Sequence, residues 1–167
     1  FFILYSMIKL IKNTNLYTPD YLGKKDLLVA GTKIVAIADN LDAYKSEATV
    51  IDAQGNIVTP GLIDQHMHIT GAGGKQGFSS MTPEVTLSEL IACGTTTVVG
   101  LLGTDGTARN IKSLYGKAKS LDEEGVSAYM LCGYYGLDSV TITGDIQGDM
   151  VFIDKVFQDL VLDHGDH

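Results

Sequence analysis

The sequence predicts an α/β protein in which a small β-rich segment precedes a parallel sheet built from strand–helix units. Residues 7–58 contain short alternating apolar runs separated by tight turns, which is typical of small sheets. After Pro60, a strand, a glycine-rich loop and a helix follow one another repeatedly, which is typical of a parallel sheet. We therefore divide the chain into a partial β-sandwich domain at residues 7–58 and a strand–helix domain at residues 59–167.

Within the first domain, residues 9–13 read as one strand. Residues 26–30 and 33–38 read as a hairpin around Gly31 and Thr32. Residues 49–53 and 57–59 read as a second hairpin around 54–56. A sheet this small buries little apolar surface, so we do not expect it to be stable by itself.

The second domain begins with a predicted strand at 61–68 and a glycine-rich loop at 71–77. A helix should follow, with Thr82 as its N-cap, Pro83 at its first position and Gly94 at its end. Its predicted inner face is Val85, Leu90 and Ile91. Residues 95–102 are almost continuously apolar or β-branched, as in a parallel strand that is buried on both faces.

A second helix is predicted from apolar residues at helical spacing, and it should end at Gly125. These residues are Ile111, Leu114, Tyr115, Ala118 and Leu121. A strand at 127–132, a loop at 133–144, a short helix near Asp149 and a fourth strand within 151–162 complete the pattern. A closed eight-fold barrel needs about 250 residues. The sequence therefore predicts an incomplete TIM-like (β/α) barrel of about three and a half units, with functional side chains at the carboxyl ends of its strands.

The formal net charge of −8 disfavours a nucleic acid or an anionic membrane as a partner. Arg109 is the sole arginine, so bidentate phosphate clamps are almost absent. Cys93 and Cys132 lie in apolar runs, and we predict buried thiols in a reducing compartment, the cytoplasm. The apolar residues at the start are too few for a signal peptide or a membrane span, and we expect Met7 to be the initiator.

His66 and His68 carry the clearest chemical signal in the sequence. Residues i and i+2 on a strand face the same side, so the two imidazoles should lie together at the carboxyl end of the first strand. Such a pair is half of a metal site, with zinc, iron, nickel or manganese as candidates. The alternative is two hydrogen-bonded histidines beside a surface loop.

Several motifs resemble the amidohydrolase superfamily and, within it, the isoaspartyl dipeptidase (β-aspartyl-peptidase) family. The resemblance covers about residues 7–157 and would make this chain an N-terminal fragment. The VVGLLGTD run is the most specific of these motifs, because its GLLGTD part is not general to the superfamily. The motifs are PGLIDQHMH at 60–68, GAGG at 71–74, TPEV at 82–85, VVGLLGTD at 98–105 and TITG at 141–144.

The resemblance implies a zinc-dependent metallo-dipeptidase that hydrolyses the isoaspartyl peptide bond of dipeptides by attack of a metal-bound hydroxide. His66 and His68 would bind the more buried of two zinc ions. Tyr135 would be catalytic, donating a hydrogen bond to the developing oxyanion. Ordinary aromatic packing is the alternative for Tyr135, and Tyr134 is its neighbour if the register slips by one residue.

The same resemblance implies a substrate-binding set that consists of Gly73, Gly74, Lys75, Thr104 and Tyr135. The glycines would let the backbone approach the aspartyl end of the dipeptide. Thr104 would contact the same end, or it would simply cap its loop. Lys75 stands where the family has a glutamate that receives the substrate's α-amino group, so substrate choice is in doubt at this position.

Other departures concern the metal. The family's metal-bridging lysine should fall near position 160, where Leu160 stands, and the nearest lysine is Lys155. The tail at 158–167, with His164 and His167, does not follow the family, as a frameshift or a truncated read would produce. Because most ligands of a two-zinc site are missing, we expect this fragment to be inactive alone.

Two other functions remain open at this stage. One is another amidohydrolase, such as a dihydroorotase-like or hydantoinase-like cyclic amidase, and the other is a non-catalytic degenerate fragment. The expected partner is a small isoaspartyl dipeptide, without nucleic acid or membrane. The resemblance also implies a homo-oligomer at full length.

Overall fold

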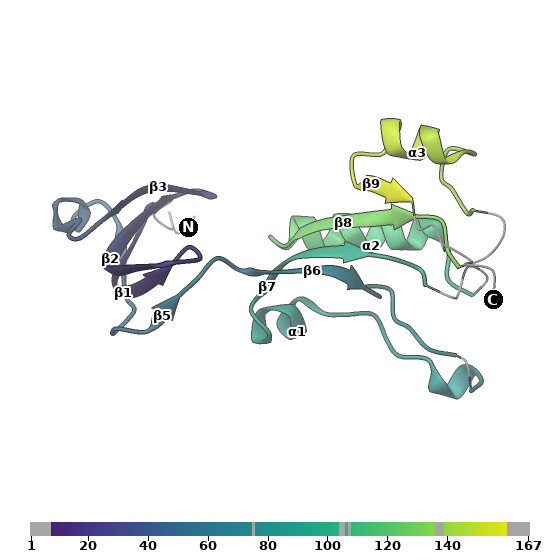
Figure 1. The fold of residues 1–167 in the computed structure, drawn as a ribbon, viewed down its shortest axis with the longest axis horizontal. Helices are drawn as coiled ribbons and strands as arrows, with labels where there is room; N and C mark the ends of the chain where they lie inside the picture. The colour runs from purple at the N-terminus through teal and green to yellow at the C-terminus, as the bar shows by residue number, and fades with distance from the viewer. Residues whose placement is uncertain (1–7, 75, 104–105, 107, 136–138, 160–167) are drawn as a thin grey trace, which may run out of the picture. The chain divides into compact units, whose positions relative to one another are not determined.

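The computed structural model describes residues 8–74, 76–103, 106, 108–135 and 139–159 (Figure 1). The chain separates into two compact units, residues 1–60 and residues 61–167. Each unit has its own sheet and its own buried core.

The first unit is a single mixed sheet. Strand β1 (Ile8–Tyr17) pairs antiparallel with β2 (Tyr21–Ala30), and β2 pairs antiparallel with β3 (Lys33–Ala38) across a tight turn. The predicted first hairpin is therefore confirmed. A short 3₁₀ helix, η1 (Asp42–Tyr44), follows, and Leu10, Leu28 and Leu41 form the core on one side of the sheet.

The predicted second hairpin is wrong. Strands β4 (Thr49–Asp52) and β5 (Ile57–Val58) do not pair with each other; both pair with β1 in parallel, one after the other along its length. The intervening turn also follows β1, since the Gly55 N–H donates to the Asn13 carbonyl at 2.8 Å. The turn residues at 54–56 therefore form a local bend along one strand path, and the chain does not reverse direction there.

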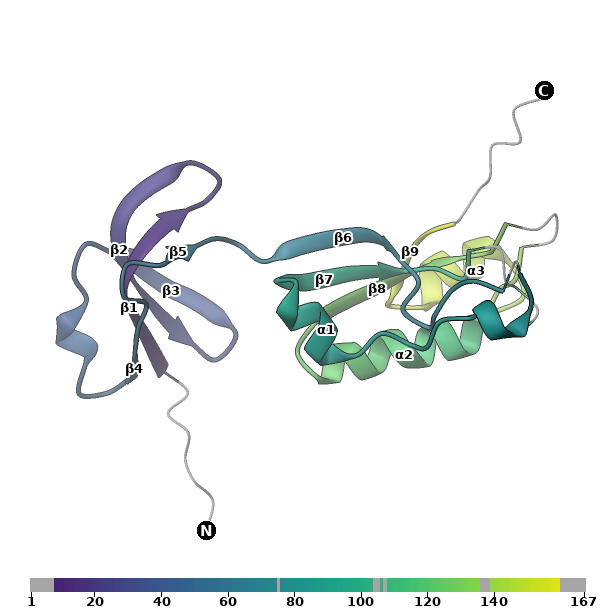
Figure 2. The ribbon, with the colours of Figure 1, turned by 90° about the horizontal axis from the view of Figure 1, so that it is seen from below.

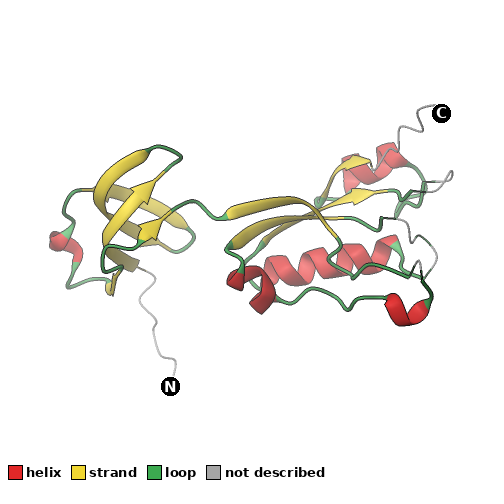
Figure 3. Ribbon diagram, turned by 60° about the horizontal axis from the view of Figure 1, so that its bottom comes forward, coloured by secondary structure: helices red, strands yellow, loops and turns green. Residues whose placement is uncertain are grey.

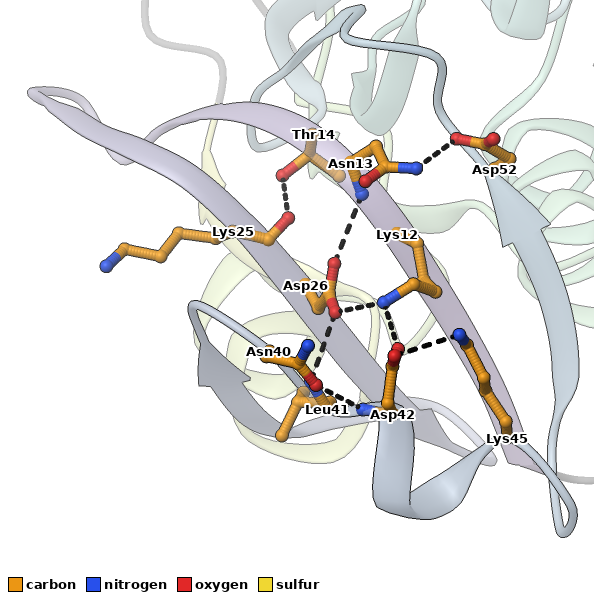
Figure 4. Close-up of polar contacts among 10 residues, drawn as sticks. All are labelled: Lys12, Asn13, Thr14, Lys25, Asp26, Asn40, Leu41, Asp42, Lys45 and Asp52. Carbon is orange, nitrogen blue, oxygen red and sulfur yellow. Dashed lines mark hydrogen bonds and ion pairs between the residues drawn. The ribbon is translucent and has the colours of Figure 1, made fainter.

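A buried carboxylate lies at an irregularity between β1 and β2. Asp26 is 4% exposed and stands opposite the place where the register shifts between Ile11 and Thr14. Its carboxylate accepts the Asn13 N–H at 3.1 Å and the Leu41 N–H at 3.1 Å, and it pairs with the Lys12 ammonium at 2.6 Å (Figure 4). One side chain thus joins β1, β2 and the segment that leads into η1.

The second unit contains a four-stranded parallel sheet in the order β6-β7-β8-β9. Its strands are β6 (Leu62–Met67), β7 (Thr95–Gly100), β8 (Ser127–Cys132) and β9 (Val156–Asp159). Each strand pairs with the next one along the chain. Sequential order without a reversal is the order of strands in a (β/α) barrel, whereas doubly wound folds reverse it.

Three helices connect the strands: α1 (Leu87–Ala92), α2 (Ile111–Glu123) and α3 (Ile146–Phe152). A single-turn 3₁₀ helix, η2 (Phe78–Ser80), lies in the long loop before α1. Figure 2 shows α1 and α2 on the same side of the sheet, and Figure 3 separates the helical layer from the strands by colour. The predicted inner face of α2 is buried at Ile111, Leu114, Ala118 and Leu121, against strand residues such as Val98 and Met130.

Helix α1 differs from its prediction. It begins after Thr86, whose N–H donates to the Glu89 carboxylate at 2.7 Å, so Thr86 and not Thr82 is its N-cap. The Thr82 side chain instead accepts the Ala72 N–H at 2.8 Å. Leu90 is buried as expected, but Ile91 is 64% exposed because a helix of six residues buries only a narrow stripe.

The two cysteines differ in their exposure to solvent. Cys132 is buried in the core at the end of β8, as predicted, whereas Cys93 is exposed where α1 ends. The prediction of two buried thiols is therefore wrong for Cys93, because the end of a short surface helix leaves its last residues in solvent. The α/β class with a parallel sheet is confirmed.

We predict that removing the Asp26 carboxylate destabilises the first unit. Asp26→Ala leaves the Lys12 ammonium and two backbone N–H groups without their acceptor, and should cost about 3 kcal/mol of unfolding free energy. Urea unfolding followed by circular dichroism measures the loss. The matched control is Asp39→Ala, because Asp39 also pairs with a lysine but its side chain is 85% exposed. That change should cost less than about 0.5 kcal/mol, and equal losses in the two variants would contradict the prediction.

We also predict a loss of stability in acid. Burial raises the pKa of Asp26, but hydrogen bonds from Lys12 and two backbone N–H groups outweigh it and leave that pKa below its usual 3.8. Hydrogen bonds from Lys12 and Lys45 lower the pKa of Asp42 to about 2. Both carboxylates therefore stabilise the fold above about pH 4, and this contribution is lost as the pH falls toward 2. The urea midpoint should fall more steeply across this range in the wild type than in Asp26→Asn/Asp42→Asn, and parallel curves would contradict it.

Candidate metal centre

The strands of the second unit run in one direction, so the loops that follow β6, β7 and β8 leave from the same end of the sheet (Figure 1). These are the loops that carry the residues singled out in the sequence. Parallel α/β proteins place functional groups at this end, because side chains from several strands converge there.

A bulge in β6 sets the direction of the histidines. Asp64 pairs with Val98 and Met67 with Gly100, so β6 has one more residue than β7 over this interval. The extra residue changes which side the later residues face. Met67 packs against the helix-side core, and by strand alternation His66 points to the opposite side. The Asp64 carboxylate accepts the His66 N–H at 3.0 Å, which satisfies a donor that the bulge frees from the ladder.

The two imidazoles lie beside each other, as the spacing predicts. Their ring centroids are 5.8 Å apart, and the rings are nearly perpendicular. His66 is exposed and His68 is half-buried. The pair therefore offers one imidazole fixed by its surroundings and a second that is accessible from solvent.

Gly103, in the loop after β7, makes room for His68. A Cβ on Gly103 would lie 2.2 Å from Cε1 of the His68 ring, so no larger residue fits without displacing the imidazole. Burial lowers the pKa of His68, and the nearby His66 and Arg109 lower it further. The neutral ring that results is the form that binds metals. Within the described residues, Nδ1 of His68 is buried and has no hydrogen-bond partner.

Tyr135 reaches the same place through its backbone. Its N–H donates to the Gly103 carbonyl at 2.9 Å, so the loop after β8 is tied to the residue on which His68 rests. The ring of Tyr134 instead packs on Gly106, where a Cβ would lie 2.5 Å from it. The two tyrosines thus have different surroundings, and Tyr135 is the one whose backbone is bonded to Gly103, the residue that packs against the His68 ring.

The predicted substrate-binding glycines lie in the loop between β6 and α1. Gly73 and Gly74 have φ angles of 86° and 100°, in the left-handed region that favours glycine. A Cβ on Gly73 would lie 2.3 Å from the Ser80 carbonyl oxygen, so this position admits only glycine. Lys75 and Thr104 fall outside the described residues.

The donor set fits part of a zinc site. Neutral imidazoles are preferred zinc ligands, and the buried Nδ1 without a partner is a nitrogen that a cation or a donor could satisfy. No cluster of three or more His, Cys, Asp or Glu side chains occurs in the part of the chain that the structure describes. His66 and His68 would therefore supply only two ligands, and a closed zinc site would require others.

Lys155 does not replace the bridging lysine that the resemblance implies. It precedes β9, so it lies at the opposite end of the strand from the histidine end of the sheet. Its ammonium pairs with the Asp122 carboxylate at 2.8 Å and lies 5.5 Å from the centroid of the Tyr129 ring. It thus joins α2 to the sheet and has a structural role.

The side of the sheet that faces away from the helices carries a shallow apolar groove of about 430 Å³. Because strand residues alternate between the two sides, this groove is the counterpart of the helix-side core. Ile63 and Phe157 are 63% and 52% exposed there. The groove is lined in part by Ile63, Thr97, Val99, Tyr129, Leu131 and Phe157.

Gly103 and Arg109 contribute to this end of the sheet, although no sequence motif predicts these roles. The sequence places Gly103 only within the VVGLLGTD motif, and Arg109 only as the sole arginine of the chain. Two features of the sequence point to these residues: Gly103 directly follows the apolar and β-branched run at 95–102, and Arg109 is the sole arginine of an acidic chain and stands just before the predicted second helix. None of the described helices is long and apolar enough to cross a membrane.

The chain aligns with a solved β-aspartyl dipeptidase from Fervidobacterium islandicum AW-1, in complex with β-Asp-Leu, at 46% identity and a TM-score of 0.82. The alignment covers 90% of this chain and 40% of that one. This chain is similar to β-aspartyl dipeptidases. The resemblance to these dipeptidases and to the amidohydrolase superfamily that the sequence predicts is thereby confirmed.

Curated relatives of this chain include a dihydroorotase and a D-hydantoinase, which belong to the same superfamily. The dihydroorotase of Streptococcus thermophilus is 37% identical over 107 residues, which are 63% of this chain and 24% of the relative. The D-hydantoinase of Geobacillus stearothermophilus is 40% identical over 97 residues, or 56% of this chain and 19% of the relative. No family model matches. The chain therefore spans about two-fifths of the solved dipeptidase and a quarter or less of these curated relatives.

We predict that Gly103→Ala weakens zinc binding by the histidine pair. The new methyl group would overlap the His68 ring, and the φ of 67° strains any residue with a Cβ, so the imidazole must move. Competition titration with a chromophoric chelator should show a loss of at least about 10-fold in zinc affinity. The control is Gly116→Ala in the middle of α2, where a Cβ meets nothing within 4 Å. It should leave zinc affinity unchanged, and a Gly103→Ala chain with wild-type zinc affinity would contradict the prediction.

Proposed function

We propose that this chain is part of a zinc-dependent dipeptidase that hydrolyses the isoaspartyl peptide bond of dipeptides. The observation that carries the proposal is the 46% identity to a β-aspartyl dipeptidase over 90% of this chain. That relative is solved with β-Asp-Leu, so we assign the same class of substrate. The proposed reaction is the hydrolysis of an amide bond. The dipeptidases and the dihydroorotase and hydantoinase relatives all belong to the amidohydrolase superfamily, which supports this class of reaction.

His66 and His68 would hold zinc, together with ligands that the described residues do not include. When bound, zinc lowers the pKa of a water and polarises the amide carbonyl that the water attacks. Burial, and after it the nearby His66 and Arg109, lower the pKa of His68, which favours the neutral imidazole that binds a metal. In the proposed site His68 stays fixed against Gly103, whereas the exposed His66 can adjust to the ion.

Tyr135 would stabilise the oxyanion that develops on the amide carbonyl. A hydroxyl aimed at this oxygen contributes most in the transition state, where the negative charge is largest. The proposal is supported by the hydrogen bond between the Tyr135 N–H and the Gly103 carbonyl. This bond keeps the loop after β8 beside Gly103, which packs against the His68 ring. Tyr134 packs on Gly106 and is assigned no chemical role.

Gly73 and Gly74 would bind the aspartyl end of the dipeptide through their backbone. Because glycine has no side chain, the backbone at Gly73 can approach a carboxylate closely. The Gly74 N–H donates to the Ser80 Oγ at 3.2 Å, so it would have to exchange this bond for one to the substrate. Lys75 and Thr104 complete the proposed binding set. A lysine at 75 repels the α-ammonium that the family's glutamate attracts, so a substrate with a free α-amino group should bind more weakly here than in the family.

The cyclic amidases among the curated relatives give the second candidate function. A dihydroorotase or hydantoinase would use the same histidine pair on a cyclic amide. Its support is narrower, because the similarity to these relatives covers 63% and 56% of this chain, against 90% for the dipeptidase. Dihydroorotate and hydantoin therefore serve as the competing ligands in the binding test.

We predict that the purified chain binds zinc through His66 and His68. His66→Ala and His68→Ala should each reduce zinc affinity by at least about 100-fold, because each removes one of few ligands. His164→Ala/His167→Ala is the matched control, since it removes two histidines without touching the pair. Isothermal titration at fixed pH measures all four proteins. Unchanged affinity in the two single variants would overturn the metal assignment.

The same protein tests the reaction. With zinc and bicarbonate added, we expect the 167-residue chain to bind β-Asp-Leu in preference to dihydroorotate and hydantoin but not to hydrolyse it, since the described residues bring no third ligand to His66 and His68. Release of free leucine measures turnover. Clear turnover would overturn the expected inactivity and support the dipeptidase function directly. Preferential binding of a cyclic amide would overturn the dipeptidase assignment in favour of the second candidate.

A further inference from the structure

Arg109 is the chain's one arginine and is only 8% exposed. A guanidinium removed from water is costly unless acceptors satisfy its donors. Its Nε donates to the Thr70 carbonyl at 3.1 Å, and its Nη2 donates to the Ala72 carbonyl at 3.1 Å and the Thr82 carbonyl at 3.4 Å. These bonds hold the backbone of another loop.

The three carbonyls lie on the two sides of the β6–α1 loop, which we define as residues 69–85. Near its ends the loop narrows to a neck, where backbone hydrogen bonds join its two sides. The Thr82 N–H donates to the Ala72 carbonyl at 2.8 Å, and the Val85 N–H donates to the Ile69 carbonyl at 3.1 Å. The two sides also approach closely at Gly71, where a Cβ would lie 2.3 Å from the Thr82 carbonyl oxygen. Arg109, which belongs to a different loop, therefore bridges the two sides of this neck.

The β6–α1 loop connects the two halves of the candidate site. It begins directly after His68, and beyond the neck it carries Gly73 and Gly74. Arg109 comes from the loop after β7, which also carries Gly103, the residue that packs against the His68 ring. The arginine thus ties the proposed substrate loop to the same segment that fixes the metal-binding histidine.

We propose that Arg109 is a positioning residue that locks the neck of the β6–α1 loop and so fixes Gly73 and Gly74 relative to the histidine pair. Its effect on substrate rests on the proposed function, whereas the lock itself does not. The residue type is specific, because a planar guanidinium reaches several carbonyls at once from fixed directions. A lysine keeps the charge but offers a single nitrogen.

Hydrogen exchange followed by mass spectrometry tests the lock. In Arg109→Lys and Arg109→Met, amides within residues 69–85 should exchange at least about 10-fold faster, while amides of β7 and β8 keep their protection. Lys112→Met is the matched control, because Lys112 is an exposed cation three residues further along and makes none of these bonds. Wild-type exchange in the loop of both arginine variants overturns the lock, and so does equal acceleration throughout β7 and β8. If Arg109→Met does not fold, Arg109→Lys decides.

Separate titrations with zinc and with β-Asp-Leu test the positioning role. In Arg109→Lys, dipeptide affinity of the zinc-loaded chain should fall by at least about 10-fold while zinc affinity changes by less than about 3-fold. A general loss of structure would instead lower both the dipeptide affinity and the zinc affinity. Unchanged dipeptide binding despite faster loop exchange overturns the substrate role. A wild-type chain that binds neither zinc nor dipeptide overturns the proposed function and this role with it, and the exchange measurement then decides the lock alone.

Discussion

The contact between the His68 ring and Gly103 is the constraint on which the candidate site depends. A Cβ at position 103 would lie 2.2 Å from the ring, so the loop after β7 can approach the histidine only because this residue has no side chain. The Gly103 carbonyl then accepts the Tyr135 N–H at 2.9 Å. One glycine therefore brings together a proposed metal ligand from the end of β6 and the proposed oxyanion residue from the loop after β8.

The two sides of the parallel sheet have different roles. Val98, Ala128, Met130 and Val156 pack against the helices and form the core, whereas the alternate residues line an open apolar groove. The bulge in β6 leaves Met67 on the first side, so by strand alternation His66 faces the second. In this way a stable, well-packed layer supports side chains that remain accessible at the carboxyl ends of the strands.

The first unit meets a different requirement. Its small sheet has a small apolar core, and a buried Asp26–Lys12 pair links two strands at a break in their register. Such a pair is costly to desolvate, but each charge has several partners here, which limits the cost. The network lets the register shift without leaving backbone donors unsatisfied (Figure 4).

The sequence by itself determined the elements whose signals are local. The apolar period of α2, the β-branched run of β7, the sequential strand–helix units and the closeness of His66 to His68 all follow from spacing along the chain. Tertiary structure decided the remainder. It placed β4 and β5 along β1, left Ile91 and Cys93 in solvent, put Lys155 at the wrong end of its strand for a metal, and bound Arg109 across a loop 27 to 39 residues away in sequence. These outcomes depend on which distant segments meet, and periodicity within one segment carries no information about its partners.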